Sequence, residues 1–394
     1  MKGALNNITI LDLTTVGAGP FMTSILGDLG ANVIKVESPS GDEGRRIGSN
    51  LQAGGIGLYF IGFNRNKRSI KLDLKNGKGL EVFYRMVKKA DVVADNFRVG
   101  VCEKLKIDYE SLKTINPSII YAKISAFGTT GPYKERPGYD LIVQAMSGGM
   151  SITGEPGGKP VRAGIPLGDL AGGCYAAIGI LSAINARSVT GKGRKIEVSL
   201  LDGQIAWLTY QAAYYLFSKK IPEPVGAGHP SAVIYDRFRT ADGYIVVIAQ
   251  REPFWSNFCK AISREDLATD GRFKADDKRL QNKKKLYDII EPIIAARPTK
   301  EWEEKLVGLD IPCGPVNNLE QALSDPQVLS RKMVVEIEIP GYGAVKVPGN
   351  PIKMSEFEER FIATPRLGQQ SEEILKEFGC SDSDISELRE RQVI

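Results

Sequence analysis

The stretch Ile8–Glu37, ITILDLTTVGAGPFMTSILGDLGANVIKVE, sets the fold of this chain. It opens with an apolar, β-branched strand pattern and a glycine turn, after which Phe21, Ile25 and Leu29 recur at helical spacing. Pro20 suits the start of that helix, because its missing N–H would have no intrahelical partner there. The closing NVIKVE has the composition of a second strand. Strand, helix and strand in this order predict a parallel βαβ unit.

The same alternation continues through the first half of the chain. Residues 77–89 have apolar positions at helical spacing, and residues 91–95 and 118–124 are strand-like and apolar. We therefore predict an α/β fold with a doubly wound, Rossmann-like large domain. Further on, residues 170–187 carry a helical apolar stripe, and residues 201–218 predict an apolar, aromatic helix.

A second, smaller domain of α+β type is expected in the middle of the chain. The segment 221–226, IPEPVG, breaks the helical pattern, and a new strand pattern follows at residues 244–248. The predicted organisation is a large domain at 1–200 completed by 330–394, a linker at 201–225, a small domain at 226–318 and a return linker at 319–329.

Composition limits the class of protein. With 394 residues, 42% hydrophobic and 25% charged, the chain resembles a soluble globular protein. We find no apolar run of the roughly 20 residues that a bilayer span needs, and no signal-peptide pattern at the start. A cytoplasmic location is the default expectation.

Side-chain inventory narrows the possible chemistry further. The net charge of +5 is modest and favours a small anionic ligand over nucleic acid. His229 is the only histidine, so histidine-rich metal sites are excluded and no metal site is predicted. The five cysteines lack zinc-like spacing, which favours free thiols: Cys102, Cys174, Cys259, Cys313 and Cys380.

The glycine turn after the first strand invites comparison with a dinucleotide-binding loop. That fingerprint needs a third glycine where Met22 stands, so nicotinamide binding is disfavoured. Backbone N–H groups of the turn, around Val16 and Ala18, could still receive an anion at a helix N-terminus. A purely structural turn explains the pattern equally well.

Two other segments combine basic residues with strand ends. The run 63–73 concentrates positive charge, which fits either a solvated loop or an edge that contacts an anion. Asn96, Phe97 and Arg98 follow a buried strand, where an aromatic ring and an arginine could hold an adenine and a phosphate. A capping turn is the alternative interpretation.

Asp169 lies within Gly164–Gly173, GIPLGDLAGG, just before a helical pattern. One interpretation is an ordinary helix N-cap. The other is a catalytic carboxylate, kept ionised by the helix N-terminus and the glycine N–H groups. A desolvated carboxylate can attack an activated acyl group.

Together these segments resemble the class III CoA-transferases, the group that contains formyl-CoA transferase, carnitine CoA-transferase and α-methylacyl-CoA racemase. The resemblance spans nearly the whole chain. Besides the Asp169 segment, it rests on LGDLGANVIKVE (26–37), NKRSIKLDLK (66–75), DNFR (95–98), FGTTGPY (127–133), RPGYD (136–140), GHPS (228–231) and IPCGPV (311–316).

The resemblance implies a two-domain fold, an interlocked homodimer and CoA transfer between an acyl-CoA donor and a carboxylic acid. Asp169 falls at the family's nucleophilic aspartate, which forms an aspartyl anhydride and then an aspartyl-CoA thioester. Coenzyme A is a substrate in this scheme, and no tightly bound cofactor is expected. The predicted CoA-binding residues are Val16, Ala18, Leu72, Lys75, Asn96, Phe97, Arg98, Lys104 and Tyr139.

The chain departs from the family pattern in three places. Ser38 replaces a family arginine, so phosphate contacts are expected to shift to Arg45 or Arg46. The tetraglycine loop of formyl-CoA transferase is missing, which disfavours formyl and oxalyl substrates. Tyr139 stands at the histidine of the racemase pair. Acyl-CoA racemisation and acyl-CoA binding without turnover remain the alternative functions.

Overall fold

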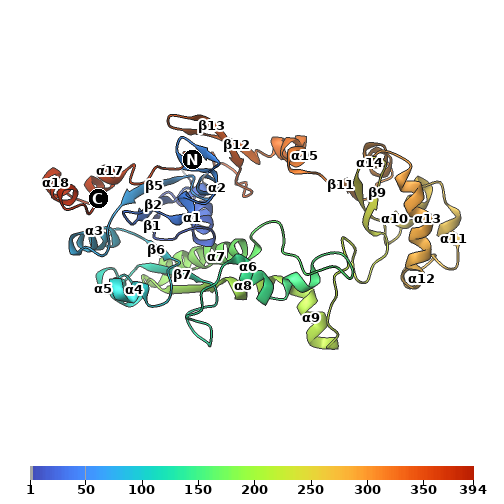
Figure 1. The fold of residues 1–394 in the computed structure, drawn as a ribbon, viewed down its shortest axis with the longest axis horizontal. Helices are drawn as coiled ribbons and strands as arrows, with labels where there is room; N and C mark the ends of the chain where they lie inside the picture. The colour runs from blue at the N-terminus through green and yellow to red at the C-terminus, as the bar shows by residue number, and fades with distance from the viewer. Residues whose placement is uncertain (1–2, 49) are drawn as a thin grey trace. The chain divides into compact units, whose positions relative to one another are not determined.

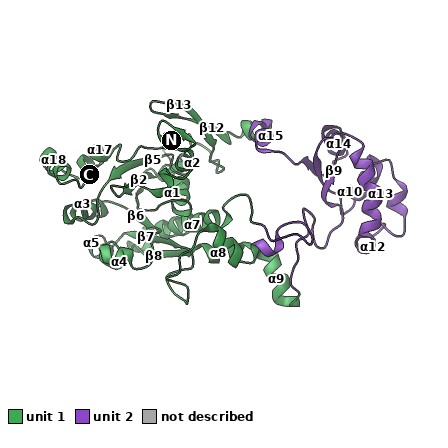
Figure 2. Ribbon diagram, viewed as in Figure 1, with its two compact units in different colours: residues 1–149, 162–220, 327–394 green, residues 150–161, 221–326 purple. Residues whose placement is uncertain are grey.

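The computed structural model describes residues 3–48 and 50–394, and the chain divides into two compact units (Figures 1 and 2). Unit 1 comprises residues 1–149, 162–220 and 327–394, and unit 2 comprises residues 150–161 and 221–326. Residues 150–161 thus belong to unit 2, whereas the sequence pattern predicts them within the large domain at 1–200. Each unit has its own hydrophobic core.

Unit 1 is built on a parallel six-stranded sheet in the order β5-β2-β1-β6-β7-β8. Strands β1, β2, β6 and β7 are almost completely buried, as the apolar runs in the sequence predicted. The strands are β1 (Thr9–Asp12), β2 (Asn32–Glu37), β5 (Lys67–Lys71), β6 (Val92–Asp95), β7 (Ile120–Ser125) and β8 (Lys195–Ser199). This is the α/β architecture with a parallel central sheet that the sequence predicted.

Helices cover both faces of this sheet. One face packs against α1 (Ala18–Asp28) and α7 (Leu167–Thr190). The other face packs against α3 (Gly77–Val87), α5 (Tyr109–Ile115), α17 (Ser371–Glu377) and α18 (Asp382–Glu390). Unit 1 also contains the helices α2 (Leu58–Phe63), α4 (Val101–Leu105) and α6 (Asp140–Met146) and the 3₁₀ helix η1 (Glu43–Arg45). The 3₁₀ helix η2 (Gly149–Ile152) begins at the last residue of this segment of unit 1 and continues into residues assigned to unit 2.

The helix α7 corrects one expectation from the sequence. By length and composition alone α7 could span a membrane, so the prediction that no apolar run approaches that length is wrong. In the structure α7 packs against α1, α8 and strand β7, and it buries small residues such as Ala176 and Ala183. These contacts are those of a core helix.

The predicted helix at 201–218 is two helices, α8 (Leu200–Trp207) and α9 (Thr209–Ser218). Thr209 has φ of 45°, a conformation that interrupts a continuous helix. None of the residues of α9 is buried.

A small satellite core in unit 1 lies beside α2. There the hairpin of β12 (Val334–Ile339) and β13 (Gly343–Pro348) packs with the short strands β3 (Gln52–Ala53) and β4 (Ile56–Gly57).

Unit 2 contains an antiparallel three-stranded sheet in the order β11-β10-β9. Its core includes Trp255 and Trp302, both almost inaccessible to solvent. Its elements are β9 (Tyr235–Arg239), β10 (Tyr244–Ile248), α10 (Phe254–Ala261), α11 (Asp266–Thr269), α12 (Asp276–Gln281), α13 (Lys283–Ala295), α14 (Thr299–Val307), β11 (Cys313–Pro315) and α15 (Leu319–Ser324). The helix α16 (Pro326–Ser330) follows at the return to unit 1.

Candidate active site

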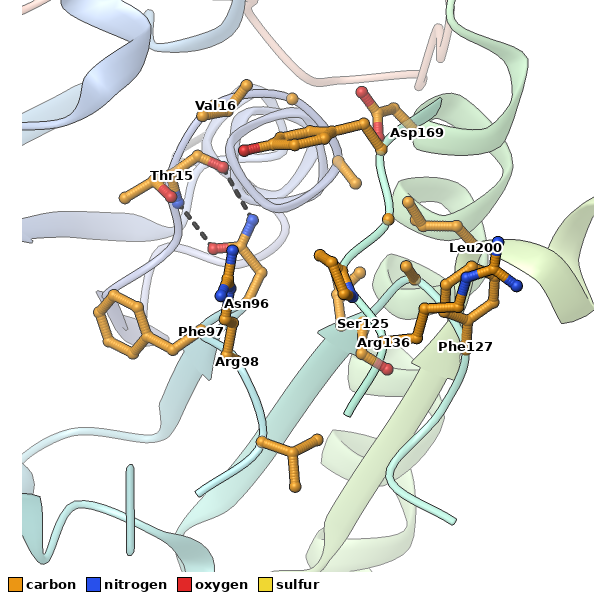
Figure 3. Close-up of a pocket in the computed structure, with 18 of the residues that line it drawn as sticks. Thr15, Val16, Asn96, Phe97, Arg98, Ser125, Phe127, Arg136, Asp169 and Leu200 are labelled. Atoms are coloured by element: carbon orange, nitrogen blue, oxygen red, sulfur yellow. Dashed lines mark hydrogen bonds between the residues drawn. The ribbon is translucent and has the colours of Figure 1, made fainter. Parts of the chain in front are cut away.

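A pocket of about 520 Å³ lies in unit 1 where the order of the sheet reverses between β1 and β6. At such a switch point the loops after two adjacent parallel strands diverge and leave a crevice. The pocket is lined by residues 15–18 near the end of β1, 96–99 after β6 and 124–127 at the end of β7, and residues 134–139 complete its wall. Figure 3 shows these loops converging with Asp169 and Leu200.

The turn after β1 is held in place by side chains from other elements. Asn96 accepts a hydrogen bond from the Thr15 N–H and donates one to the Thr15 carbonyl, both at 2.8 Å (Figure 3). Val16 has φ of 68°, a left-handed conformation that a β-branched residue adopts at a cost of roughly 1–3 kcal/mol. A conformation of this kind persists only where surrounding contacts enforce it.

Asp169 lies in the first turn of α7, two residues after the helix begins at Leu167. It is therefore not the N-cap that the sequence suggested, because Pro166 holds that place without a side-chain cap. The capping is done from α6, where Asp140 Oδ1 accepts hydrogen bonds from the N–H groups of Gly168 at 2.8 Å and Asp169 at 3.4 Å. The side chain of Asp169 therefore takes no part in capping α7.

The Asp169 carboxylate rests directly on the backbone of Gly17. A Cβ atom placed on Gly17 would come within 2.2 Å of Asp169 Oδ2 and 3.4 Å of the Tyr59 hydroxyl. Glycine at position 17 is thus required for this approach, and it brings the turn, Asp169 and Tyr59 to one point. Tyr59 has no local signature in the sequence, because it lies on α2, far along the chain from Asp169.

The electrostatics of Asp169 differ from our expectation. Burial, and then the nearby Asp140 carboxylate, raise the pKa of Asp169 to about 7. Burial also raises the pKa of Tyr59 to about 12, with further contributions from Asp169, Asp42 and Asp140. The helix N-terminus does not offset these effects, so Asp169 titrates near neutral pH beside a tyrosine that stays protonated.

Six of the nine predicted CoA-binding residues line the pocket with Asp169: Val16, Ala18, Asn96, Phe97, Arg98 and Tyr139. The pocket wall carries the cations of Arg98, Lys134 and Arg136 and the carboxylates of Glu43 and Glu135. The guanidinium of Arg136 stacks on Phe127, at 5.6 Å from the ring centroid. Asn96 differs from the other five residues because its side-chain amide is already hydrogen-bonded to the Thr15 backbone through both its oxygen and its nitrogen. Its role is therefore to hold the turn that lines the pocket.

The other three predicted residues lie outside this pocket. Leu72 is 0% exposed within the core beneath α3, so it presents no surface to a ligand, and we revise its predicted role to packing. Lys75 and Lys104 are exposed. They remain candidates only for the distal parts of a long ligand.

Arg45 and Arg46, the two candidates to replace the family arginine at Ser38, differ in whether the guanidinium is already paired. Arg45 grips both oxygens of Glu37, at 2.7 and 2.6 Å, and its guanidinium stacks 3.8 Å from the centroid of the Phe60 ring. Arg46 is exposed and makes one long hydrogen bond, of 3.4 Å, to the Ser40 carbonyl. Arg46 is therefore the arginine that can turn to a phosphate.

No group of three or more His, Cys, Asp or Glu side chains suited to a metal ion occurs within residues 3–48 and 50–394. His229 belongs to unit 2, whereas Asp169 belongs to unit 1. The site in unit 1 therefore consists of a half-buried carboxylate at the switch point of the sheet, in a pocket whose wall carries both cationic and acidic side chains.

Comparison with known proteins identifies the class of protein. The family model for CoA-transferase family III matches residues 5–371, and the chain belongs to this family and is a CoA-transferase. It is 38% identical to human succinyl-CoA:glutarate CoA-transferase, over 99% of this chain and 90% of that protein. It is 39% identical to acetyl-CoA:oxalate CoA-transferase of Acetobacter aceti, over 97% of each chain. A crystal structure of a CAIB/BAIF family protein from Brucella suis superimposes with a TM-score of 0.88 at 35% identity, covering 96% of this chain and 100% of that one.

Proposed function

We propose that this protein moves CoA from an acyl-CoA donor to a carboxylic acid acceptor through covalent intermediates on Asp169. The observation that carries the proposal is the position of the Asp169 carboxylate, which rests on the bare backbone of Gly17 in the pocket. A thioester carbonyl entering the pocket meets a partly desolvated carboxylate there. Such a carboxylate is a competent nucleophile toward an activated acyl group.

The proposed reaction has four balanced steps. Ionised Asp169 attacks the donor thioester carbonyl, and the C–S bond breaks to give an aspartyl anhydride and CoA thiolate. The thiolate attacks the aspartyl carbonyl, releasing the donor acid as a carboxylate and leaving an aspartyl-CoA thioester. The acceptor carboxylate then attacks this thioester, forming a second anhydride and expelling CoA thiolate. The thiolate finally attacks the acceptor acyl carbon, which forms the new acyl-CoA and regenerates the Asp169 carboxylate.

The pocket offers separate environments for the parts of the CoA molecule. Phe97 and Arg98 follow β6 and provide an aromatic face and a cation for an adenine and a phosphate. Arg46, Lys75 and Lys104 are the exposed cations we assign to its outer phosphates. The neutral hydroxyl of Tyr59 lies near the Asp169 carboxylate, where it can donate to oxygen that gains charge in the anhydride step.

The acid substrates are inferred from charge and from relatives. The names of the relatives specify succinyl-CoA and glutarate in one case and acetyl-CoA and oxalate in another, and succinate, glutarate and oxalate are all dicarboxylates. Lys134 and Arg136 line the pocket and can pair with a second carboxylate that does not react. We therefore propose that at least one of the two acids is a short dicarboxylate.

Trapping the intermediate tests the mechanism. The protein is incubated with a panel of acyl-CoAs, succinyl-CoA among them, then treated with hydroxylamine and digested for peptide mass analysis. A hydroxamate at Asp169, absent from an Asp169→Asn variant, is the expected result. CoA transfer with an unmodified Asp169 would refute the covalent route. Exchange of the α-proton of an acyl-CoA with solvent deuterium, without transfer, would instead indicate a racemase, and binding without either reaction would indicate a binding protein.

We also propose that the protein works as a homodimer, interlocked as the family resemblance implies. The helices α8 and α9 expose a group of large apolar side chains: Ile205, Trp207, Tyr210, Tyr214, Tyr215, Leu216 and Phe217. Phe217 is 94% exposed. So many exposed large apolar side chains on two consecutive helices favour a protein–protein interface. Light scattering during gel filtration should give twice the 43.0 kDa chain mass, and Phe217→Asp should lower it. The cytoplasmic location stays a prediction.

A further inference from the structure

The strongest unassigned feature is a pair of buried charges beneath the turn that carries Gly17. Lys35 lies on β2 and is 1% exposed, although a buried parallel strand normally carries apolar residues. Its Nζ lies 2.8 Å from Asp42 Oδ2, and both side chains are almost inaccessible to solvent. Burying two charges costs free energy, which their attraction offsets only when their geometry is good and their other hydrogen bonds are made.

Both members of this pair also hold the backbone of the turn. Asp42 Oδ1 accepts a hydrogen bond from the Val16 N–H at 3.0 Å. Lys35 Nζ donates to the Thr14 carbonyl at 2.7 Å. The pair therefore grips the turn on each side of Thr15, the residue whose own N–H and carbonyl are held by Asn96.

Asp42 also connects this turn to the segment before α2. The same Oδ1 accepts a hydrogen bond from the Gly44 N–H at 2.8 Å and so caps the 3₁₀ helix η1. The helix η1 packs against α2, which carries Tyr59. One carboxylate thus positions both the turn and the element that bring Gly17 and Tyr59 to Asp169.

The geometry at Val16 shows why this contact matters to the site. Val16 is held at φ of 68°, which is unfavourable for a β-branched residue, and Gly17 follows it directly. If the Val16 N–H loses its acceptor, the residue is free to return to an ordinary conformation, and Gly17 then moves relative to Asp169 Oδ2. Small displacements of reacting groups have large effects on rate.

We propose that Asp42, with Lys35 as its buried counter-ion, is a positioning residue of this transferase, holding Val16 in its left-handed conformation so that Gly17 seats the Asp169 carboxylate. Asp42 acts through the turn and touches no substrate in this scheme. The inference rests on the proposed function of Asp169.

The test compares Asp42→Ala, which removes the acceptor, with Asp42→Asn, which keeps an oxygen for the Val16 N–H. The fraction of active protein is titrated by the hydroxylamine-trapped Asp169 adduct, and kcat is expressed per titrated site. We expect kcat to fall by about tenfold or more in Asp42→Ala, with partial rescue in Asp42→Asn and a KM for acyl-CoA changed less than about threefold. Lys35→Met should follow the same pattern.

Asp28→Asn is the matched control. It weakens another buried ion pair of unit 1, between Asp28 and Arg65, where Arg65 Nε donates to Asp28 Oδ1 at 2.9 Å. We expect it to reduce stability while leaving kcat per site within about twofold, since it does not touch the turn. An equal loss of kcat in Asp28→Asn, or an unchanged kcat in Asp42→Ala, would overturn the proposal.

Amide hydrogen exchange provides a readout that does not depend on activity. The peptide covering residues 14–18 should exchange faster in Asp42→Ala than in the parent protein, whereas a peptide from β6 should not change. Unchanged protection of residues 14–18 would also overturn the proposal. Absence of CoA transfer by the parent protein would refute the proposed function instead, and the exchange result would then still test the structural link between Asp42 and the turn.

Discussion

The rate at which acyl-CoA acylates Asp169 should rise steeply between pH 6 and 8. Burial and Asp140 raise the pKa of Asp169 to about 7, whereas an unperturbed aspartate would already be ionised at pH 5. Only the ionised carboxylate is a nucleophile, so the rate follows its ionised fraction. With a pKa of about 7, that fraction grows from roughly 0.1 at pH 6 to roughly 0.9 at pH 8, so we expect about a tenfold increase in kcat/KM for the donor.

The assay is single-turnover acylation, with the hydroxylamine-trapped Asp169 peptide quantified from pH 5 to 9. Asp140→Asn is the perturbation that tests the cause. It removes a negative charge near Asp169 while an amide oxygen can still accept from the Gly168 N–H. The midpoint of the profile should therefore move below 7 in this variant.

The substrates titrate identically with both proteins, so the difference between the two profiles belongs to the protein. A flat profile from pH 5 to 8 in the parent protein would refute the raised pKa. A midpoint near 7 that does not move in Asp140→Asn would refute the electrostatic role of Asp140 and leave burial as the sole cause.

Further predictions concern the contacts around the site. Gly17→Ala should lower kcat by about a hundredfold, because its Cβ would lie 2.2 Å from Asp169 Oδ2, whereas Gly62→Ala, with no atom within 4 Å, should retain kcat. Asp169→Asn should raise the free energy of unfolding in urea by about 2 kcal/mol at pH 8, allowing for partial exposure of the site, and leave it unchanged near pH 4. The sign follows because the pKa of Asp169 is higher in the folded than in the unfolded protein. Its ionisation therefore lowers the free energy of unfolding as the pH rises from the unfolded pKa to about 7, and the full loss persists above pH 7. Arg46→Ala should raise the KM for acyl-CoA about fivefold without loss of stability. Arg45→Ala should lower the free energy of unfolding by about 3 kcal/mol in the same urea measurement, because it leaves the Glu37 carboxylate buried and unpaired. The reverse ranking of the two arginines would refute our assignment of the phosphate contact.

The strands of the large domain could be predicted closely because their burial on both faces leaves an apolar run. The second strand runs from Asn32 to Glu37, as predicted, and β6 and β7 begin within two residues of their predicted starts. The edge strand β8 was missed, because Lys195–Ser199 alternates polar and apolar residues over a short length. Local pattern is weakest where a strand is short and half exposed.

In the candidate site, too, only residues with a local sequence pattern could be predicted. Asp169 could be singled out because glycine and proline around a carboxylate are visible in the sequence. Its pKa and its contact with Gly17 could not be predicted, since both depend on α6 and α1 packing beside α7. Asp140 and Tyr59 were not identified for the same reason: their roles come from tertiary contacts with no local signature.

The discontinuity of unit 1 has a consequence for how the protein is made. Asp73 N donates to the Val393 carbonyl at 2.9 Å, and Val393 is 0% exposed in the same core as β1 and β2. Residues 221–326 are synthesised between these partners, which at about 5–20 residues per second takes on the order of ten seconds. Throughout that interval one face of the sheet lacks α17 and α18, so the nascent chain exposes an apolar surface that favours binding by a chaperone. The candidate active-site pocket, which is lined by residues made before residue 201, can therefore form on a sheet that is still half covered.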